Sequence, residues 1–312
     1  MLNADGLRKA YQSGALSRTE LWAALKALNN SLLAYKPLLQ NTDICKLGVS
    51  VGGLQVILHN GLVFTLDPED VRQPPNIILA HGEYERGEHR VLSKLWANAG
   101  VFFDIGANIG WYSLHAARDN PACRIFGFEP VPETFAALNR NIAANELEHR
   151  IRVFNFGLSD QAGEQTMFRP SFSGSPAASM RELHPQEGSD SFLCRFVTLD
   201  EFFAQTGEKT LDLIKCDVEG AELFVLRGGI QTIRQSKPYI FIEILRKWSR
   251  AFGYEPNEIF AVLLDMGYGA YAVGHNSVQP ISGITEETTE TNFVFAHPER
   301  PSLEQLSSEL HD

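Results

Sequence analysis

The sequence predicts an α/β fold, a Rossmann-like, doubly wound and mostly parallel sheet with a small N-terminal extension. Two observations carry this prediction. From Gly100 onward, apolar strand-like runs alternate with helical patterns, which is typical of sheets assembled from βαβ units. The first of these runs, from Val101 to Ile105, leads into the glycine-spaced segment GANIG, where a buried strand turns tightly into a helix.

The first 75 residues are predicted to form an accessory region of helices and a β-hairpin. Leucines at near-helical spacing over residues 1–40, with Ser17 followed by Glu20 as a capping box, predict two short helices. Alternating residues over 45–66, around the turn signal Asn60 and Gly61, predict the hairpin. The charged, proline-bearing stretch 67–75 is predicted to be a connection.

Residues 76–298 are expected to hold the main sheet, and residues 299–312 to form a tail. Strands are predicted at 101–105, 124–129, 152–157, 212–217 and 239–244, and an antiparallel edge pair at 268–273 and 292–297. Helices are predicted at 85–97, 111–118, 132–145, 219–235 and 256–266. Two short strands within residues 163–198 are joined by a linker rich in Ser, Pro and Gly, which is predicted to be a surface loop.

The composition excludes several classes of function. The net charge of −11 and the lack of a basic stripe argue against nucleic-acid binding. No stretch reaches the roughly 18 apolar residues of a membrane span, and the N-terminus lacks an apolar signal core. We therefore expect a cytoplasmic protein that does not insert into a membrane. The four cysteines and nine histidines show no metal-ligand or disulfide spacing, so no protein-built metal site is predicted.

Acidic residues stand at or near the ends of successive predicted strands. In an open α/β sheet, ligands bind beyond the carboxyl ends of the strands, where the strand order reverses. These acids are therefore the first candidates for a functional site. In chain order they are Asp104, Glu129, Asp160, Asp217 with Glu219, and Glu243.

Glu129 is the most specific of these acids, because a carboxylate that closes the strand after a glycine turn can accept hydrogen bonds from both hydroxyls of a ribose. Pro130 follows it, and Pro132 presets the start of the next helix. Two roles fit Asp104: it pins the glycine turn, or it provides a counter-charge for the amino end of a cofactor. Asn108 either caps the following helix or contacts a ligand carboxylate through its amide.

Taken together, these motifs resemble the FkbM-type family of S-adenosylmethionine-dependent methyltransferases. The segments DIGANIGWYS, FEP, the SD of GLSD, TLDEFF, DLIKCDVEGAE and PYIFIEI follow in this order within roughly residues 84–296. The resemblance implies a seven-stranded class I methyltransferase sheet, S-adenosyl-L-methionine as cofactor, and methylation of a hydroxyl on a sugar, glycan or small metabolite. Residues 1–75 lie outside it, and their helices and hairpin are the candidate contact for a homodimer.

The resemblance also implies roles for individual residues. The methionine part of the cofactor would be held by the glycine turn, that is, by Asp104, Gly106, Asn108 and Gly110. The ribose would be bound at Glu129 and Pro130, and the adenine edge at Ser159 and Asp160. The sulfonium and the acceptor would meet at Asp217, Glu219 and Gly220. The loop over residues 170–190 has no counterpart that can be aligned, and it is a candidate for setting the acceptor.

Methyl transfer from a sulfonium is an in-line displacement, and an alcohol acceptor must also lose its proton. Asp217 or Glu219 is the candidate base, because burial and neighbouring carboxylates raise the pKa of an acid toward neutral pH. The alternatives are that Asp217 only orients the cofactor and that Glu219 only opens the next helix. Lys215 shares a strand face with Asp217 and either tunes its charge or anchors the strand. Glu243 is a further catalytic candidate, on the acceptor side.

Other functions share parts of this pattern. An NAD(P)-dependent oxidoreductase would share the strand, the turn and the ribose acid, but it predicts G-x-G-x-x-G where Asn108 stands here. A non-catalytic binding protein on a methyltransferase scaffold is expected to have lost the turn or the acids, and both are intact. A nucleic-acid methyltransferase is disfavoured by the acidic balance and by the lack of an N-P-P-[YF] tetrapeptide.

Overall fold

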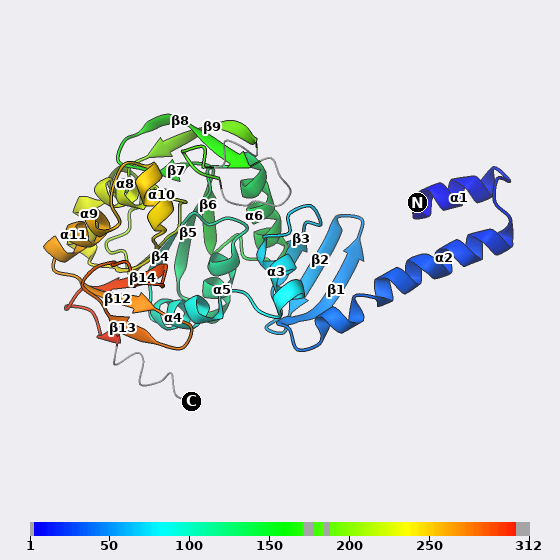
Figure 1. The fold of residues 1–312 in the computed structure, drawn as a ribbon, viewed down its shortest axis with the longest axis horizontal. Helices are drawn as coiled ribbons and strands as arrows, with labels where there is room; N and C mark the ends of the chain where they lie inside the picture. The colour runs from blue at the N-terminus through cyan, green and yellow to red at the C-terminus, as the bar shows by residue number, and fades with distance from the viewer. Residues whose placement is uncertain (1–2, 171–177, 184–187, 304–312) are drawn as a thin grey trace.

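A computed structural model describes residues 3–170, 178–183 and 188–303, and its central feature is an eight-stranded sheet (Figure 1). Five parallel strands lie side by side in the order β6 (Ile151–Phe154), β5 (Arg124–Phe128), β4 (Val101–Ile105), β10 (Leu213–Cys216) and β11 (Tyr239–Glu243). Three antiparallel pairings then extend the sheet through β14 (Asn292–Ala296), β12 (Gly269–Val273) and β13 (Val278–Pro280).

The strand order reverses between β4 and β10. From β4 the chain moves outward through β5 to β6, and it then returns to the other side of β4 with β10 and β11. Because the chain segments that follow β4 and β10 lead away in opposite directions, a crevice opens beyond the carboxyl ends of these two strands. The doubly wound, mostly parallel sheet predicted from the sequence is therefore present, and its switch point lies at the end of β4.

Helices cover both faces of the sheet. One face carries α4 (Arg86–Trp96), α5 (Trp111–Asp119) and α6 (Pro132–Ala144). The other carries α7 (Leu199–Thr206), α8 (Glu222–Arg227), α9 (Ile230–Ser236) and α11 (Asn257–Asp265), while α10 (Arg246–Ala251) follows β11. Side chains alternate along β4, so Phe102 belongs to the first core and Phe103 to the second, and both are fully buried.

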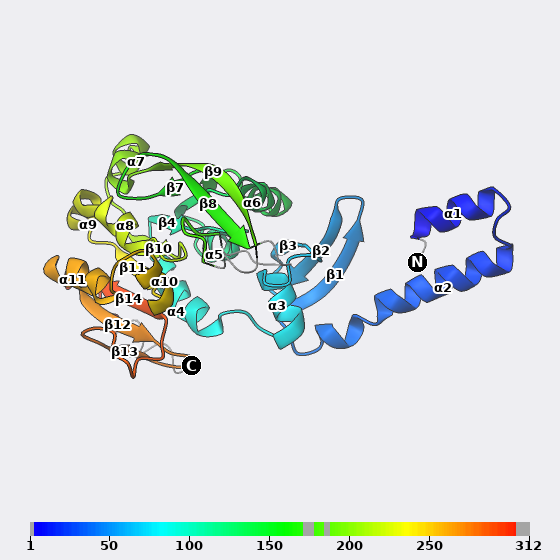
Figure 2. The same cartoon turned by 45° about the horizontal axis from the view of Figure 1, so that its top comes forward.

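The N-terminal region forms an arm and a small sheet beside the main body (Figures 1 and 2). Helices α1 (Ala4–Gln12) and α2 (Arg18–Leu33) project away from the body, and η1 (Lys36–Leu39) leads into the antiparallel strands β1 (Ile44–Ser50), β2 (Gly53–Leu58) and β3 (Val63–Leu66). Helix α3 (Pro74–His81) follows. The Asn145 amide joins β3 to α6, since it accepts from the Val63 N–H at 2.9 Å and donates to the Val63 carbonyl at 2.7 Å.

The structure corrects the predicted hairpin and the number of strands in the main sheet. The hairpin is a three-stranded sheet, because Val51 and Gly52 make a second turn before the predicted one at Asn60 and Gly61. The main sheet has eight strands rather than seven, because β13 forms within the segment that links β12 to β14. The predicted antiparallel pairing of β12 with β14 is present, but β13 lies outside β12 and forms the edge of the sheet.

Two predicted elements are broken by contacts between distant segments. The strand predicted over 152–157 ends at Phe154, and β7 (Gly157–Leu158) leaves the main sheet to join a small one with β9 (Ser189–Val197) and β8 (Gly163–Pro170). The helix predicted over 219–235 is two helices, α8 and α9. They are separated at Gly228, where a side chain's first carbon would lie 2.1 Å from the Ser159 carbonyl oxygen. The linker predicted over 170–190 lies partly outside the described residues.

Within the described part of the chain, no helix combines the length and the apolar character needed to cross a membrane.

Candidate cofactor and methyl-transfer site

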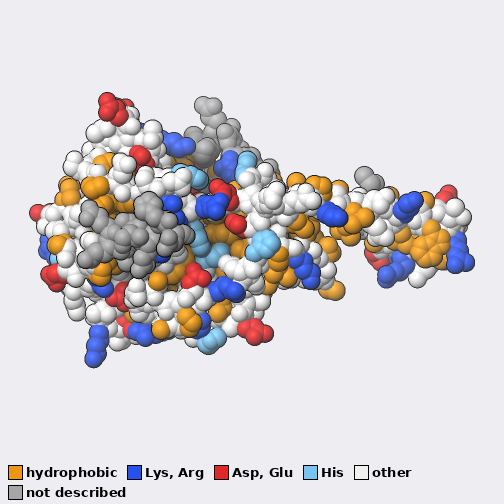
Figure 3. All heavy atoms as spheres, turned by 90° about the horizontal axis from the view of Figure 1, so that it is seen from below, with side chains coloured by type: hydrophobic (Ala, Val, Ile, Leu, Met, Phe, Trp, Pro, Cys, Tyr) orange, Lys and Arg blue, Asp and Glu red, His pale blue; other side chains and the backbone are white. Residues whose placement is uncertain are grey.

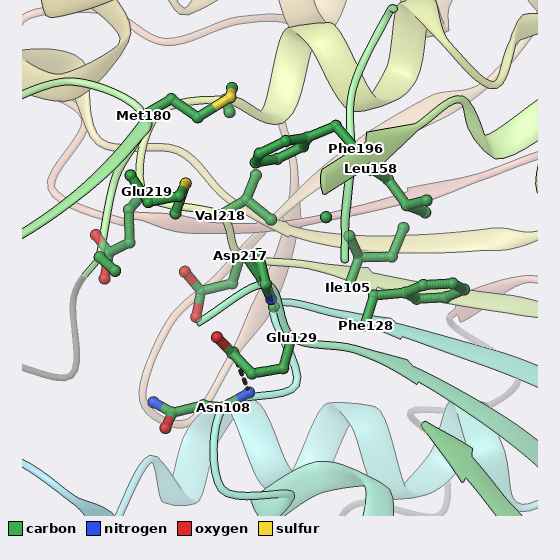
Figure 4. Close-up of a pocket in the computed structure, with 16 residues that line it drawn as sticks. Ile105, Asn108, Phe128, Glu129, Leu158, Met180, Phe196, Asp217, Val218 and Glu219 are labelled. Atoms are coloured by element: carbon green, nitrogen blue, oxygen red, sulfur yellow. Dashed lines mark hydrogen bonds between the residues drawn. The ribbon is translucent and has the colours of Figure 1, made fainter. Parts of the chain in front are cut away.

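A pocket lies beyond the carboxyl ends of β4, β5 and β10, at the switch point of the sheet (Figure 4). Its volume is about 630 Å³ when the open mouth is included. One end is apolar, with Ile105, Phe128, Leu158 and Phe196 on its wall. The other end carries the carboxylates of Glu129, Asp217 and Glu219. The pocket thus joins an apolar compartment to an acidic one.

The glycine turn forms the floor of this pocket. Gly106 has a φ of +77°, and a side chain there would place its first carbon 1.9 Å from the carbonyl oxygen of Asp217. Only glycine allows both this conformation and this close approach. Asn108 also has a positive φ, of 50°, and its amide oxygen Oδ1 is buried without a partner in the described structure. The turn therefore brings backbone and an unpaired acceptor to the edge of the pocket.

Gly110 lies away from the pocket. Its φ is +90°, and a first side-chain carbon would lie 2.6 Å from both Leu114 and Leu138. The structure therefore places this glycine in the packing between α5 and α6, and it is absent from the pocket wall. Close packing against these two leucines, rather than contact with a ligand, therefore explains why this residue is a glycine.

Glu129 stands at the end of β5 with both carboxylate oxygens held by the backbone. Oε2 accepts from the Asn108 N–H and Oε1 from the Val131 N–H, each at 3.0 Å. Burial raises the pKa of Glu129 to about 7, although these two hydrogen bonds act in the opposite direction. Each oxygen keeps a second lone pair, so the carboxylate can still accept from two ligand hydroxyls. Pro130 lines the pocket beside it.

Asp104 and Lys215 lie beneath the turn and hold it in place. Asp104 is buried, its Oδ2 accepts from the Ser113 hydroxyl at 2.5 Å, and it pairs in register with Lys215 on β10. The Lys215 ammonium donates to the Gly106 carbonyl and to Asp217 Oδ2, both at 3.2 Å. Burial acts to lower the pKa of Lys215, but the charges of Asp217 and Asp104 outweigh it and the pKa is raised. Neither Asp104 nor Lys215 lines the pocket.

Glu243 stands beside the carboxyl groups of Asp217 and Glu219 at the acidic end of the pocket, although it does not itself line the pocket. Asp217 directly follows Cys216, which pairs with Ile242, so Asp217 and Glu243 lie at the neighbouring ends of β10 and β11. Burial raises the pKa of Glu243, and the charges of Asp217 and Glu219 raise it further. Burial also raises the pKa of Glu219, whose Oε2 is buried and has no partner among the described residues. These three carboxyl groups together therefore favour a bound cation.

Comparison with known proteins agrees with this geometry. The family described as the methyltransferase FkbM domain matches residues 104–269, slightly more than half of the chain. The chain belongs to the FkbM methyltransferase family.

Individual proteins that resemble the chain match different shares of it. It is 35% identical over 156 residues to the 31-O-demethyl-FK506 methyltransferase FkbM of Streptomyces tacrolimicus, covering 41% of this chain and 58% of the relative. It is 31% identical over 162 residues to the hexuronic acid methyltransferase AglP of Haloferax volcanii, covering 51% and 63%. The crystal structure of methyltransferase FkbM from Methylobacillus flagellatus KT matches with a TM-score of 0.43 and 17% identity, covering 85% of this chain and 59% of that one. The chain thus spans less than two thirds of the length of these relatives.

Within the FkbM domain, the structure reveals a residue whose role the sequence analysis missed. Glu222, the last acid of DVEGAE, is buried, and its Oε1 accepts from the backbone N–H groups of Val218 and Gly220 at 3.2 and 3.0 Å. The Tyr254 hydroxyl lies 3.2 Å from Glu222 Oε2 and 3.0 Å from the Gly220 carbonyl. Glu222 therefore fixes the loop that presents Asp217. The sequence feature that could have indicated this role is the second glutamate of the motif, but the residues that it contacts are determined by the tertiary structure.

The predicted adenine-edge residues of the FkbM domain lie beside the pocket rather than in its wall. Ser159 and Asp160 line a neighbouring pocket with Arg181, and the Ser159 hydroxyl donates to Asp160 at 3.3 Å. Leu158, one residue earlier, lines the main pocket. Met180 belongs to the walls of both pockets. The displacement follows from β7, which pairs with β9 and turns this segment away from the main sheet.

Proposed function

We propose that this FkbM-family protein binds S-adenosyl-L-methionine in the pocket at the end of β4 and transfers its methyl group to a hydroxyl oxygen of a sugar or another small hydroxylated metabolite. The observation that carries the proposal is the position of Glu129. Its carboxylate belongs to the acidic end of a pocket whose other end is apolar, and each of its oxygens has a free lone pair. A nucleoside with a positively charged tail fits such a pocket, with its base at the apolar end and its tail at the acidic end.

The residues present fit this cofactor. Leu158 and Phe196 offer an apolar wall to the adenine, and Glu129 offers two acceptors to the ribose. The unpartnered Asn108 Oδ1 offers an acceptor to the ammonium group of the methionine tail. The carboxylate of Asp217 supplies negative charge where the positive sulfonium would lie. The roles of Asp104, Gly110 and Lys215 in this proposal are indirect, because they hold the turn and the loop.

The bound cofactor supplies a methyl group on a positively charged sulfur. In the transfer, the sulfur–carbon bond breaks as the carbon–oxygen bond to the acceptor forms, and the acceptor hydroxyl gives up a proton. We assign this proton to Asp217, because its carboxylate lines the pocket, whereas Glu243 does not line it and burial raises the pKa of Glu243 to about 10. Lys215 donates a hydrogen bond to Asp217 and orients its carboxylate. Glu219 lines the same pocket, and its Oε2 has no partner among the described residues, so it is placed to form a hydrogen bond with the acceptor.

The acceptor class rests on the relatives and on the chain's acidic character. One relative is described as a hexuronic acid methyltransferase and another as a 31-O-demethyl-FK506 methyltransferase. The net charge of −11 disfavours a nucleic-acid acceptor. The motif and the family both favour methyl transfer over an NAD-dependent oxidation.

A thermal-shift experiment tests the cofactor. S-adenosylhomocysteine is expected to raise the melting temperature of the wild-type protein, and NAD is not. Glu129→Ala should abolish the shift, whereas Glu148→Ala, which removes an exposed carboxylate near the end of α6, should retain it. A shift with NAD alone, or a full shift in Glu129→Ala, would overturn the assignment.

A further inference from the structure

A second pocket lies where the N-terminal sheet meets the starts of α4 and α5. Its volume is about 660 Å³ including the mouth, and its walls come from segments far apart in the sequence. We call it the histidine pocket; it is lined chiefly by His59, Tyr84, Arg86, His89, Trp111 and His115. Seen from below, histidine side chains gather near the middle of the molecule, among hydrophobic side chains and charged ones of both signs (Figure 3).

The interior of the histidine pocket is aromatic. The Trp111 ring is 5.4 Å from the Tyr84 ring, which meets it edge-on at 80°, and 4.5 Å from the ring of His115. His89 and His115 meet at 4.6 Å. Stacked and edge-on rings of this kind form a rigid apolar surface at little cost in conformational entropy. Such a surface suits the apolar face of a flat or chair-shaped ring.

Polar atoms in this interior are left without partners. Trp111 is 6% exposed, and neither its Nε1 donor nor His89 Nδ1 has a hydrogen-bond partner in the described structure. Burial lowers the pKa of His89 and lowers that of His115 to about 3, so both rings are neutral near pH 7. A neutral imidazole has one donor and one acceptor nitrogen. Hydroxyl groups, which both donate and accept, complement such a wall better than a cation or an anion does.

The histidine pocket and the methyl-transfer pocket share no lining residue, but a chain of contacts links them. Trp111 of the histidine pocket stands at the start of α5, directly after the glycine turn. The neighbour of Tyr84, Glu85, accepts a hydrogen bond from Tyr112, and the Lys215 ammonium lies 5.5 Å from the Tyr112 ring. Burial raises the pKa of Tyr84, and the charges of Glu85 and Asp217 raise it further. Tyr84 thus lines the histidine pocket, and the contacts of Glu85, Tyr112 and Lys215 lead from it to Asp217 of the methyl-transfer pocket.

We propose that the histidine pocket binds a sugar ring of the acceptor, with Trp111 and Tyr84 against its apolar face and the neutral histidines on its hydroxyls. Only the claim that the bound sugar is the methyl acceptor rests on the proposed function, because sugar binding itself requires no cofactor. At the mouth, the exposed side chains of His59, Asp43 and Arg86 are placed to contact further hydroxyl or carboxylate groups. The site would give residues 1–75 a role in acceptor recognition.

The test is direct sugar binding without cofactor. Methyl glycosides of a hexose, a deoxyhexose and a hexuronic acid are titrated into the full chain by saturation-transfer NMR and calorimetry. At least one is expected to bind. Trp111→Phe keeps an aromatic ring but removes the orphaned donor, and His59→Ala removes an exposed side chain from the mouth. Each should weaken binding by about tenfold, the worth of one hydrogen bond.

His149→Ala is the matched control, because His149 is exposed and lies outside the pocket. It should leave sugar affinity unchanged, and S-adenosylhomocysteine affinity should be unchanged in all three variants. Failure of every glycoside to bind, or equal binding by the wild type, Trp111→Phe and His59→Ala, overturns the inference. Failure of S-adenosylhomocysteine to bind the wild type instead overturns the proposed cofactor, independently of the sugar result.

Discussion

Replacement of Glu129 by glutamine tests both the electrostatics of the fold and the cofactor site. Burial raises the pKa of this carboxyl from an ordinary 4.5 to about 7 in the folded protein. Folding therefore favours its protonated form. Its contribution to stability is fully present below pH 4.5 and is lost as the pH rises through 7. The difference between the two pKa values corresponds to about 3 kcal/mol at high pH.

The Glu129→Gln variant cannot titrate at this position. Between pH 5 and pH 9, the wild type should lose about 2.5 kcal/mol more unfolding free energy than the variant does. The variant should also carry a pH-independent loss of roughly 1–3 kcal/mol, because its NH₂ group faces one of the two backbone N–H donors that Glu129 now satisfies. Urea unfolding at pH 5, 7 and 9 measures both effects. Parallel stability profiles for the two proteins would refute the reasoning.

Cofactor affinity should also depend on whether the Glu129 carboxyl group is protonated. An ionised carboxylate accepts hydrogen bonds from both ribose hydroxyls, so S-adenosylhomocysteine should bind wild type more tightly as the pH rises through 7. At pH 8, Glu129→Gln should bind about 100-fold more weakly, the worth of about 3 kcal/mol of charged hydrogen bonding. Glu148→Gln is the control with an exposed carboxyl. Calorimetry that gives equal affinities for Glu129→Gln and the control would contradict this role.

Three further outcomes are expected. Gly106→Ala should lower the free energy of unfolding in urea by roughly 3 kcal/mol or more, because its methyl group would meet the Asp217 carbonyl. Gly14→Ala, where φ is nearly the same but the space is open, should lower it by only about 1 kcal/mol. Equal losses in the two variants would contradict the close approach. Lys215→Met should lower the free energy of unfolding by about 3–5 kcal/mol, because Asp104 stays buried without its counter-charge. A variant as thermally stable as the wild type would contradict this. Asp217→Asn should weaken the binding of S-adenosylmethionine more than that of S-adenosylhomocysteine, since only the former carries the sulfonium charge; an equal loss in calorimetry would argue against contact with the sulfonium.

The core of the candidate site could be predicted from sequence because its signals are local. The strand, the glycine turn and the acid that closes the next strand lie within about 30 residues, and their order fixes their meeting point in a parallel sheet. Gly106, Asn108 and Glu129 accordingly line one pocket. Asp217 joins them because β10 lies next to β4 at the switch point. The capping box of Ser17 and Glu20 is present for the same local reason.

The remaining features depend on contacts between distant segments. Spacing could not show that Gly110 packs against Leu138 rather than facing a ligand. Nor could it show that Glu222 meets Tyr254, 32 residues away. Nor could it show that Ser159, which the resemblance assigns to the adenine edge, lines a neighbouring pocket because the chain leaves the main sheet after Phe154. The histidine pocket was not predicted at all, since its walls come from four separate segments.

The most direct test of the account is the position of S-adenosylhomocysteine in an experimentally determined complex with this protein. The account predicts one molecule in the pocket at the end of β4. Its ribose hydroxyls should lie within hydrogen-bond distance of the two Glu129 oxygens, its adenine against Leu158 and Phe196, and its sulfur toward Asp217. A ligand bound elsewhere, or a ribose out of reach of Glu129, would contradict the central claim.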